Sequence, residues 1–290
     1  MEQDENLAFD VPRELFPARH RFRDVDGTRI HYVDEGQGET LLLLHGNPSW
    51  SFLYRKIIAG LKDRYRCIAL DFPGYGLSDA ASGYRFTPRE HSRLLEHFVD
   101  HLSLKDIGVM VQDWGGPIGL GLAGRRPDLV TWFVIGNTFA WPLNSLPRLR
   151  VFSWLMGGPV GVSLTYAFNF VPRAFFFRGF AQKPAPQIFS LYMAPWKSRK
   201  RRIAAVIAPR QLTLASDYMS EVEGNLPKLS SRPALIVWGL KDLAFRETER
   251  RHFEQLFPTH KTILFDNASH FLQEDVGDQI AAAIKDFNRG

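Results

Sequence analysis

The chain has 290 residues, 45% of them hydrophobic, which is enough apolar material for one sizeable domain with an inserted subdomain. The net charge of +5 comes without Lys and Arg residues interleaved with aromatic residues along a strand, so we do not expect a nucleic-acid partner. A single cysteine, Cys67, excludes an internal disulfide, and the acidic N-terminus (residues 1–6) lacks the apolar run of a secretory signal, so we expect a cytoplasmic protein.

The first half of the chain alternates short apolar runs with helical patterns. A tight turn at Asp26-Gly27 joins the first two runs into a predicted hairpin. Thr87-Pro88-Arg89-Glu90 is a capping box with proline at the first helical position, and it begins a helix whose apolar stripe extends to Leu102. Strands are predicted over residues 21–25, 28–33, 40–44, 67–70, 107–111 and 130–135.

The second half changes character after Asn137. Short helical patterns rich in aromatic residues replace the strands from Phe139 to about Gly224, and we interpret this segment as a helical cap inserted into an α/β domain. The alternation of strands and helices on both sides of it predicts a mostly parallel, doubly wound sheet. The predicted organisation is therefore a core of residues 1–138 and 225–290, interrupted by a cap of residues 139–224. After the cap we predict strands over residues 233–238 and 262–265 and helices over residues 247–257 and 278–287.

One part of the cap resembles a membrane segment by composition. No charged residue occurs between Val151 and Pro172, a run about as long as a spanning helix needs. Gly157-Gly158-Pro159 breaks the run in its middle, so we expect a half-buried segment of a soluble domain and no membrane partner. Because such a run exposes more apolar surface than a monomer usually tolerates, we also expect the cap to help form a homo-oligomer.

The stretch around Asp113 has the layout of a nucleophile elbow, a sharp turn between a strand and a helix. An apolar strand ends in this carboxylate, and Gly115 and Gly116 begin a helix directly afterwards. Glycines let the helix backbone approach closely, and the helix N-terminus favours a negative charge. A carboxylate is already ionised at neutral pH, so it needs no base to attack a saturated carbon. Val111 departs from the elbow pattern, which usually has a small residue two positions before the nucleophile.

Polar residues follow four of the predicted strands, at the edge where ligands gather in such sheets. They are Asn47, Asp113, Asp242 and His270. The order of nucleophile, acid and histidine along the chain is that of α/β-hydrolases. The acid that orients the histidine is Asp242 or, as a second choice, Asp266, which lies only four residues before His270 and is more easily a turn residue.

Four motifs together resemble those of the haloalkane dehalogenases. They are Gly46-Asn47-Pro48, Asp71-Phe72-Pro73-Gly74-Tyr75-Gly76, Gln112-Asp113-Trp114-Gly115-Gly116 and Ser269-His270-Phe271. The resemblance covers nearly the whole chain, including Tyr192-Met193-Ala194-Pro195 in the cap. It implies an α/β-hydrolase fold, with a mostly parallel eight-stranded sheet flanked by helices and an inserted helical cap.

The same resemblance implies roles for the residues in these motifs. The residue matching Asp113 attacks the halogen-bearing carbon and forms an alkyl ester. The residues matching Asn47 and Trp114 hold the departing halide with side-chain N–H groups, and their backbone N–H groups are the expected oxyanion hole. The residue matching His270 activates water against the ester. The expected partners are therefore a halogenated substrate and water, with no cofactor and no metal.

The resemblance also bears on the identity of the acid. In some members of the family the acid follows the strand that here ends at Asn137. This chain has an asparagine there, so we assign the acid to Asp242 and expect an Asp-His-Asp triad with Asp113 and His270.

Three rival functions remain open at this stage. An epoxide hydrolase would use the same Asp113 with acidic donors from the cap, for which Tyr166, Tyr192 and Tyr218 are available, although Asn47 stands where such enzymes have an aromatic residue. A coelenterazine-type luciferase is a second rival. A ligand receptor on a hydrolase scaffold is a third, which a complete triad makes less attractive.

Further suggestive residues are assigned structural roles. His97 and His101 have the spacing of a metal pair on a helix, but no third ligand is apparent, so we expect a solvated face. The basic run of residues 197–202 is interpreted as an exposed face of the cap. The residue types of Phe175-Phe176-Phe177 and Trp141 fit either a pocket lining or the core.

Overall fold

The computed structural model describes residues 7–287, so the N-terminal residues 1–6, on which the expectation of no secretory signal depends, lie outside it. Its centre is one eight-stranded sheet with the strand order β1-β2-β4-β3-β5-β6-β7-β8. The strands are β1 (His20–Val25), β2 (Thr28–Glu35), β3 (Glu39–Leu44), β4 (Tyr65–Leu70), β5 (Ile107–Asp113), β6 (Val130–Thr138), β7 (Ala234–Gly239) and β8 (His260–Phe265).

The sheet is parallel except at its N-terminal edge. β1 pairs antiparallel with β2, and β2 pairs antiparallel with β4, whereas every pair from β4 to β8 is parallel. The prediction of a mostly parallel sheet of eight strands is therefore confirmed. Since parallel strands end at the same edge, the carboxyl ends of β3, β5, β6 and β7 bring their following residues together.

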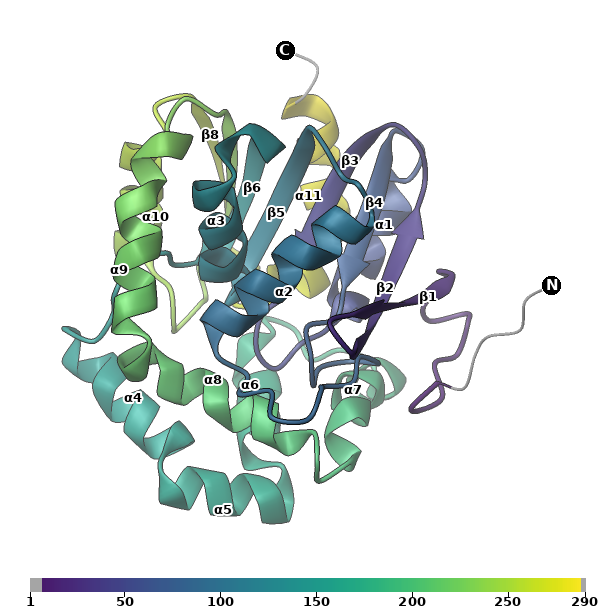
Figure 1. Ribbon diagram of the computed structural model, residues 1–290, viewed down its shortest axis with the longest axis vertical. Helices are drawn as coiled ribbons and strands as arrows, with labels where there is room; N and C mark the ends of the chain where they lie inside the picture. The colour runs from purple at the N-terminus through teal and green to yellow at the C-terminus, as the bar shows by residue number, and fades with distance from the viewer. Residues whose placement is uncertain (1–6, 288–290) are drawn as a thin grey trace.

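Helices cover both faces of the sheet, which explains why its central strands are continuous apolar runs. Figure 1 shows α2 and α3 on one face and α1 and α11 on the other. Leu41, Leu42, Leu43 and Leu44 of β3 are fully buried as a result. The α-helices are α1 (Arg55–Leu61), α2 (Pro88–His101), α3 (Gly115–Arg125), α4 (Pro147–Gly157), α5 (Pro159–Phe168), α6 (Phe170–Gly179), α7 (Pro186–Met193), α8 (Arg202–Leu214), α9 (Ser216–Asn225), α10 (Glu247–Leu256) and α11 (Leu272–Phe287).

Local sequence signals decided several of the boundaries. The predicted capping box begins α2: Glu90 N–H donates to Thr87 Oγ1 at 3.2 Å, and Thr87 N–H donates to a Glu90 carboxylate oxygen at 3.4 Å. The last helix begins six residues earlier than predicted, at Leu272, because a short turn joins it across non-helical backbone at Val276. β5 and β6 also continue beyond their predicted ends, to Asp113 and Thr138, and so place these polar residues within the sheet.

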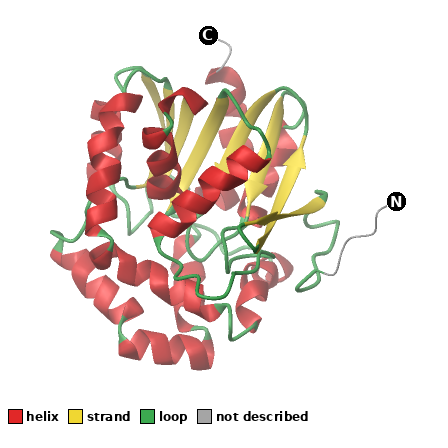
Figure 2. Cartoon of the chain, in the orientation of Figure 1, coloured by secondary structure: helices red, strands yellow, loops and turns green. Residues whose placement is uncertain are grey.

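The segment between β6 and β7 contains only helices among its regular elements, and α4 to α8 lie beyond the carboxyl edge of the sheet (Figure 2). The uncharged run is broken where the sequence indicated, since α4 ends at Gly157 and α5 begins at Pro159. Within the described residues, no single helix is long and apolar enough to span a membrane, and only α4 and α5 taken together, bent by 47°, meet that test of length and composition.

The basic run of the cap differs from its predicted exposure. Residues 197–200 are exposed, but Arg201 is half-buried and Arg202 is buried. Arg201 donates to the carbonyl oxygens of Gly76 and Ser78, and Arg202 donates to the carbonyl oxygen of Trp196 at 2.9 Å. Both guanidinium groups are therefore used to fix loops, which residue type alone did not reveal.

Candidate active site

Asp113 stands on a strained turn between β5 and α3. Its φ of +49° lies in the left-handed region, which costs a residue other than glycine about 1–3 kcal/mol. The turn is held by Thr138, whose hydroxyl donates to the Asp113 carbonyl oxygen at 2.6 Å. This geometry is that of the predicted nucleophile elbow, and it lifts the Asp113 side chain above the end of the sheet.

The helix after the elbow accommodates the large residue at position 111. A Cβ added to Gly119 of α3 would lie 2.6 Å from Leu44 Cδ1 and 3.0 Å from Val111 Cγ1. Gly119 therefore provides, on the helix, the space that elbows usually provide with a small residue on the strand. Val111 is fully buried and well accommodated.

The carboxylate of Asp113 is held by backbone N–H groups. Asn47 N–H donates to Asp113 Oδ1 at 2.7 Å, and Trp114 N–H is a second backbone donor to the same carboxylate. The loop that carries Asn47 comes this close because residue 46 is glycine, where a Cβ would lie 2.1 Å from Asp113 Oδ1. One carboxylate oxygen is thus fixed by the loop after β3, and the other faces His270.

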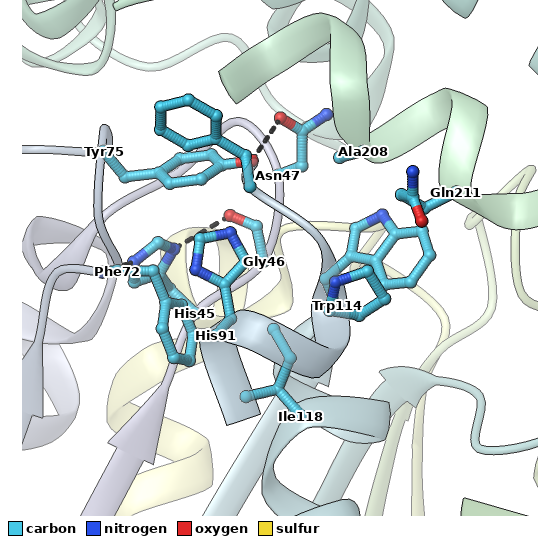
Figure 3. A pocket seen from close by; sticks show the side chains of 12 residues that line it. His45, Gly46, Asn47, Phe72, Tyr75, His91, Trp114, Ile118, Ala208 and Gln211 are labelled. Carbon is cyan, nitrogen blue, oxygen red and sulfur yellow. Dashed lines mark hydrogen bonds between the residues drawn. The ribbon is translucent and has the colours of Figure 1, made fainter. Parts of the chain in front are cut away.

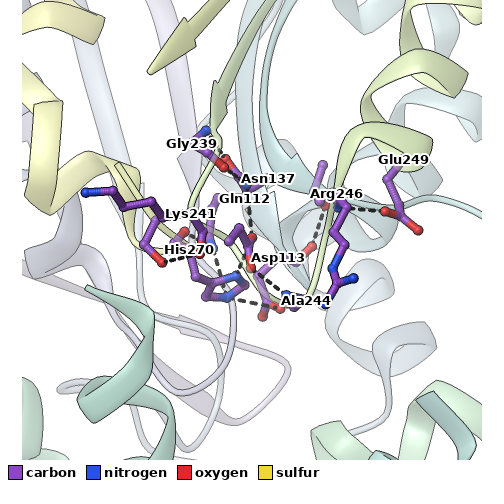
Figure 4. Close-up of polar contacts among 12 residues, drawn as sticks. Gln112, Asp113, Asn137, Gly239, Lys241, Ala244, Arg246, Glu249 and His270 are labelled. Atoms are coloured by element: carbon purple, nitrogen blue, oxygen red, sulfur yellow. Dashed lines mark hydrogen bonds and ion pairs between the residues drawn. The ribbon is translucent and has the colours of Figure 1, made fainter. Parts of the chain in front are cut away.

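His270 lies between two carboxylates. Its Nε2 is 3.6 Å from Asp113 Oδ2, and its Nδ1 is 3.0 Å from Asp242 Oδ2. All three side chains are buried. Asp266, the second choice for the acid, is exposed on the turn after β8. The end of β5 and the loops after β7 and β8 therefore bring Asp113, Asp242 and His270 together in the order of a triad. Figure 4 shows Asp113 and His270 next to each other.

Asn137 supports the acid rather than replacing it. Its Nδ2 donates to Asp242 Oδ2 at 3.0 Å, and its Oδ1 accepts the Gly239 N–H at 2.7 Å. Asp242 Oδ1 in turn accepts the Ala244 N–H at 2.7 Å. Every polar neighbour of the Asp242 carboxylate is a donor, which stabilises its negative charge in a buried position.

The surroundings shift the pKa values of Asp113 and His270. Burial is the strongest influence on Asp113 and raises the pKa of its carboxyl, while His270 and the backbone N–H groups of Trp114 and Asn47 limit the rise. Burial by itself would lower the pKa of His270, but Asp242 and Asp113 outweigh it and raise the pKa above its ordinary value of 6.5. The histidine is thus a stronger base than usual while both carboxylates are charged.

Asn47 and Trp114 line a small cavity next to this triad (Figure 3). Its volume is about 20 Å³, roughly the room of one water molecule. Asp113 does not line it, but both neighbours that hold its carboxylate do. Ala208 and Gln211 of α8 close the cavity from the side of the inserted helices.

Tyr75 orients the Asn47 side chain in this cavity. Its hydroxyl lies 3.2 Å from Asn47 Oδ1 and 3.2 Å from the Ala204 carbonyl oxygen of α8. With its oxygen turned toward Tyr75, the Asn47 amide has a buried Nδ2 without a hydrogen-bond partner in the described part of the chain. A buried donor left unpaired is costly, so this atom is available to an anion or a polar ligand group.

Two residues of the site carried no role in the sequence reasoning. Gln112 Nε2 donates to the His270 carbonyl oxygen at 2.9 Å and lies 3.2 Å from His270 Nε2, and Tyr75 holds Asn47. Gln112 lies between five apolar residues and Asp113 at the end of a fully buried strand. A buried amide at that position needs hydrogen-bond partners, and this requirement was the sequence feature that could have identified Gln112 as a site residue.

The tyrosines that kept the epoxide hydrolase hypothesis open do not line the cavity. Tyr192 donates to Glu274 Oε2 at 2.6 Å, and Tyr218 donates to the Pro117 carbonyl oxygen at 2.8 Å. Tyr166 is half-buried on α5. Two of the expected proton donors for an opening epoxide thus donate to other groups, none of the three lines the cavity, and the epoxide hydrolase alternative is not supported.

The remaining candidate residues have structural roles. His45 Nε2 accepts the Phe72 N–H at 3.0 Å, and burial lowers the pKa of this histidine. His97 is exposed and contacts Asp26, and the described residues contain no group of three or more His, Cys, Asp or Glu arranged to hold a metal. Trp141 stacks on His252, and Phe176 packs against Phe271, so neither lines the cavity.

Comparisons with known proteins agree with this geometry. Residues 39–275 match the family model described as alpha/beta hydrolase fold. Haloalkane dehalogenase 2 of Mycobacterium tuberculosis is 40% identical over 281 residues, which cover 96% of this chain and 98% of that protein. The cis-3-alkyl-4-alkyloxetan-2-one decarboxylase of Shewanella oneidensis is 34% identical over 94% of this chain and 89% of that protein.

Among solved structures, the haloalkane dehalogenase DatA from Agrobacterium tumefaciens superimposes with a TM-score of 0.86. The match covers 96% of this chain and 99% of that one at 24% sequence identity, so it supports the fold. Fold and sequence therefore agree. The chain belongs to the haloalkane dehalogenase family of enzymes with the α/β-hydrolase fold.

Proposed function

We propose that this protein hydrolyses haloalkanes to an alcohol, a halide ion and a proton through a covalent ester on Asp113. The observation that carries the proposal is that the two oxygens of the Asp113 carboxylate have different neighbours. Oδ1 is held by Asn47 N–H at 2.7 Å, while Oδ2 faces His270 Nε2 at 3.6 Å. The carboxylate is thereby oriented for attack and lies within reach of a base for the later step.

In the first step, an Asp113 oxygen forms a bond to the halogen-bearing carbon, and the electron pair of the carbon–halogen bond leaves with the halide. The nucleophile is an anion, so no base takes part. Burial raises the pKa of Asp113, which also makes its carboxylate a better nucleophile. The Asn47 Nδ2 and the Trp114 indole N–H are the proposed donors to the halide, and they act most strongly where water is excluded.

In the second step, His270 Nε2 takes a proton from water while the water oxygen attacks the ester carbonyl carbon. The resulting oxyanion is stabilised by the backbone N–H groups of Asn47 and Trp114. Asp242 holds Nδ1–H and stabilises the imidazolium that forms. Collapse of the intermediate breaks the bond between the carbonyl carbon and the alkyl oxygen, and the His270 imidazolium donates its proton to that oxygen, which leaves as the alcohol. The carboxylic acid of Asp113 then loses its proton to solvent, which restores the carboxylate.

Esterification of Asp113 also changes the pKa of His270, the proposed base. The charge on Asp113 is one of the influences that raise the pKa of His270 in the free enzyme. The ester is neutral, so this contribution disappears once the alkyl group is attached. The pKa of His270 then falls, and the histidine is more readily in its neutral, proton-accepting form when water must be activated.

We further propose that residues 139–224 act as a cap over this site, between core segments 1–138 and 225–290. Ala208 and Gln211 of α8 line the cavity, and the Ala204 carbonyl oxygen contacts Tyr75, which orients Asn47. These contacts give the helical segment an influence on which substrates reach the halide donors.

The experiment that tests the mechanism separates the two steps. His270→Phe should release about one equivalent of halide and then stop, because only ester hydrolysis needs the base. Intact-mass analysis should show the protein heavier by the alkyl group, with the adduct mapped to Asp113. Asp113→Ala should give neither burst nor adduct. A folded His270→Phe protein that binds a bromoalkane and releases no bromide would rule out the two-step scheme.

A second candidate substrate follows from the decarboxylase relative, which acts on an oxetan-2-one. Asp113 would attack the saturated ring carbon that is bonded to the ring oxygen. The bond between these two atoms would break, which opens the strained ring and leaves a carboxylate. Loss of carbon dioxide would then form a carbon–carbon double bond and expel the Asp113 carboxylate. This route consumes no water and needs no base.

The two reactions are therefore distinguishable with the same variants. Asp113→Ala should abolish both activities. His270→Phe should stop haloalkane turnover after one equivalent and leave olefin formation from an oxetan-2-one running over many cycles. Wild-type protein that makes olefin and releases no halide from chloro-, bromo- or iodoalkanes would replace the first proposal with the second.

A further inference from the structure

The helices α4 and α5 expose an apolar face, whereas the helices of a soluble protein usually bury theirs. Their large apolar side chains point outward at helical spacing, on positions i, i+3, i+4 in α4 and i, i+4, i+8 in α5. Trp154 is 68% exposed and Phe168 is 70% exposed. The outer face, as we call it, consists of Val151, Trp154, Leu155, Val160, Leu164 and Phe168.

Several inner positions of the same helices are small or polar, next to the buried Leu149 of α4. Ser153 is buried with its hydroxyl 3.1 Å from Thr213 Oγ1 of α8. Gly157 packs so closely on α8 that a Cβ there would lie 2.2 Å from Arg210 Cγ. On α5, Thr165 is buried and donates to the Gly161 carbonyl oxygen at 2.7 Å. α4 thus packs on α8 through close contacts at small and polar positions, while the outer-face side chains of both helices stay exposed.

The segment that carries the outer face has side-chain charges of a single sign. All 31 Asp and Glu residues of the chain lie outside residues 139–216, although this segment contains many basic residues. Those that are exposed are Arg148, Arg150, Arg173, Arg178, Lys183, Lys197, Arg199, Lys200 and Arg210. Within the described residues, Arg148 is the only one of these with an ion pair, to Glu249. The segment that carries the neutral apolar face therefore exposes cations and has no acidic residue of its own.

We propose that the outer face docks on an anionic lipid bilayer surface. Apolar and aromatic side chains with a basic surround are the composition that binds the interface of anionic membranes. This proposal departs from the expectation of no membrane partner and does not depend on the reaction at Asp113. Figure 1 shows α4 and α5 at the end of the molecule remote from the sheet, where a flat surface can reach them.

The geometry fits contact with the surface rather than a crossing. α4 has 11 residues and α5 has 10, so each is about 15 Å long, roughly half the thickness of a hydrocarbon core. The two helices are bent by 47°, and the inner side of α4 is hydrogen-bonded to α8. Only the outer side chains are free to enter the lipid.

A second copy of the chain is the competing occupant. An isologous contact would place the outer faces of two protomers against each other. It would also bring Arg150 and Arg173 of one protomer near the cations of its partner, with no Asp or Glu in either segment to compensate. Anionic headgroups provide that compensation, and this favours the bilayer over a dimer through the cap.

Flotation with lipid vesicles tests the proposal on the full chain. The probes are vesicles of phosphatidylcholine alone and vesicles with about one-third phosphatidylglycerol. We expect roughly tenfold or stronger binding to the anionic vesicles, reduced several-fold between about 0.05 M and 0.5 M salt as the charges are screened. Equal binding to both vesicle types, or none to either, would overturn the proposal.

Matched variants separate the apolar and the charged contributions. Trp154→Ser with Phe168→Ser should weaken binding by on the order of tenfold or more. Arg150→Gln and Arg173→Gln should each weaken it by roughly fivefold. Leu264→Ser, at another exposed leucine on β8, and Lys105→Gln, at the opposite end of the sheet, are the controls and should change binding less than twofold.

The same variants distinguish lipid binding from unfolding and from self-association. Circular dichroism melting should be unchanged in the double serine variant, because both side chains are exposed; a loss of binding that accompanied unfolding would refute the outer face as its cause. Light scattering should show the same mass for wild type and double variant. A wild-type dimer that the double variant converts to a monomer would assign the outer face to a second copy and overturn the lipid proposal.

Discussion

The replacement of Asp242 by asparagine is the sharpest test of the candidate triad, because every neighbour of this carboxylate is a donor. Oδ2 faces His270 Nδ1 and Asn137 Nδ2, both at 3.0 Å, and Oδ1 faces the Ala244 N–H at 2.7 Å. Asparagine is nearly the same size but has one acceptor and one donor. Whichever way its amide turns, a buried donor meets another donor, which costs about 1–3 kcal/mol.

The effect on the reaction is larger than this packing cost. If the amide oxygen of the new asparagine accepts the Ala244 N–H, its NH2 group faces His270 Nδ1. His270 can accept a hydrogen bond from this NH2 group only if the imidazole proton moves from Nδ1 to Nε2. That nitrogen must accept the proton from water. Triads in the wrong tautomer lose about ten-thousandfold in rate, equivalent to about 5.5 kcal/mol. Ester hydrolysis in Asp242→Asn should fall by roughly a thousandfold or more, whereas alkylation of Asp113 should change by less than about tenfold because it needs no base.

Rapid-quench measurement of halide release separates these rates, since the burst reports alkylation and the steady state reports hydrolysis. Asp266→Asn is the matched control and should behave as wild type, because Asp266 is exposed on its turn. Asn137→Ala should cost far less than Asp242→Asn, since it removes a support of the acid and leaves the acid itself. If Asn137→Ala proved the more severe change, or if the burst and the steady state fell together, the assignment of the acid to Asp242 would be wrong.

Asn47→Ala and Trp114→Phe should each slow the halide burst by roughly a hundredfold, and bromide should quench tryptophan fluorescence much less in Trp114→Phe than in wild type; equal quenching would point to a different donor. Hydrolysis should be lost as pH falls through the pKa of His270 in the alkyl-enzyme, where Asp242 still raises that pKa, whereas alkylation should persist until Asp113 is protonated. The acid limb of turnover should therefore lie at higher pH than that of the burst, and coincident limbs would contradict separate roles. Asp71→Asn should lower the free energy of unfolding at pH 7 by about 3 kcal/mol in urea titrations, because the fully buried His31 loses its carboxylate partner. The pKa of Asp71 is lowered by its partners against the effect of burial, so this stabilisation is present above its ordinary value of 3.8 and should vanish as pH falls through the folded value; a difference independent of pH would argue against the charge as its source.

Much of the fold was determined by local sequence patterns. Continuous apolar runs such as residues 40–44 predicted strands buried on both faces, and the Thr87 capping box predicted the start of α2. Asp113 followed by two glycines predicted the elbow, because a sharp turn with close backbone approach restricts which residues fit. These signals are strong since each depends on residues within one or two turns of chain.

The partners across the sheet were decided only by the tertiary structure. The choice between Asp242 and Asp266 depended on which carboxylate lies within hydrogen-bond distance of His270 Nδ1. The positions of the two residues along the chain do not predict that distance. The same is true of Gln112 and Tyr75, whose importance comes from contacts with His270 and Asn47 on other strand ends. Side-chain hydrogen bonds of this kind depend on angstrom-level placement of separate loops.

Exposure was the other property that the sequence left open. The apolar run from Val151 to Pro172 and the basic run of residues 197–202 were recognisable by composition, but the side that each residue faces was not. The structure turned Trp154 and Phe168 outward and buried Arg202 against backbone carbonyl oxygens. The physical reason is that helical periodicity predicts which residues share a face, whereas the packing of α4 and α5 on α8 decides which face is buried.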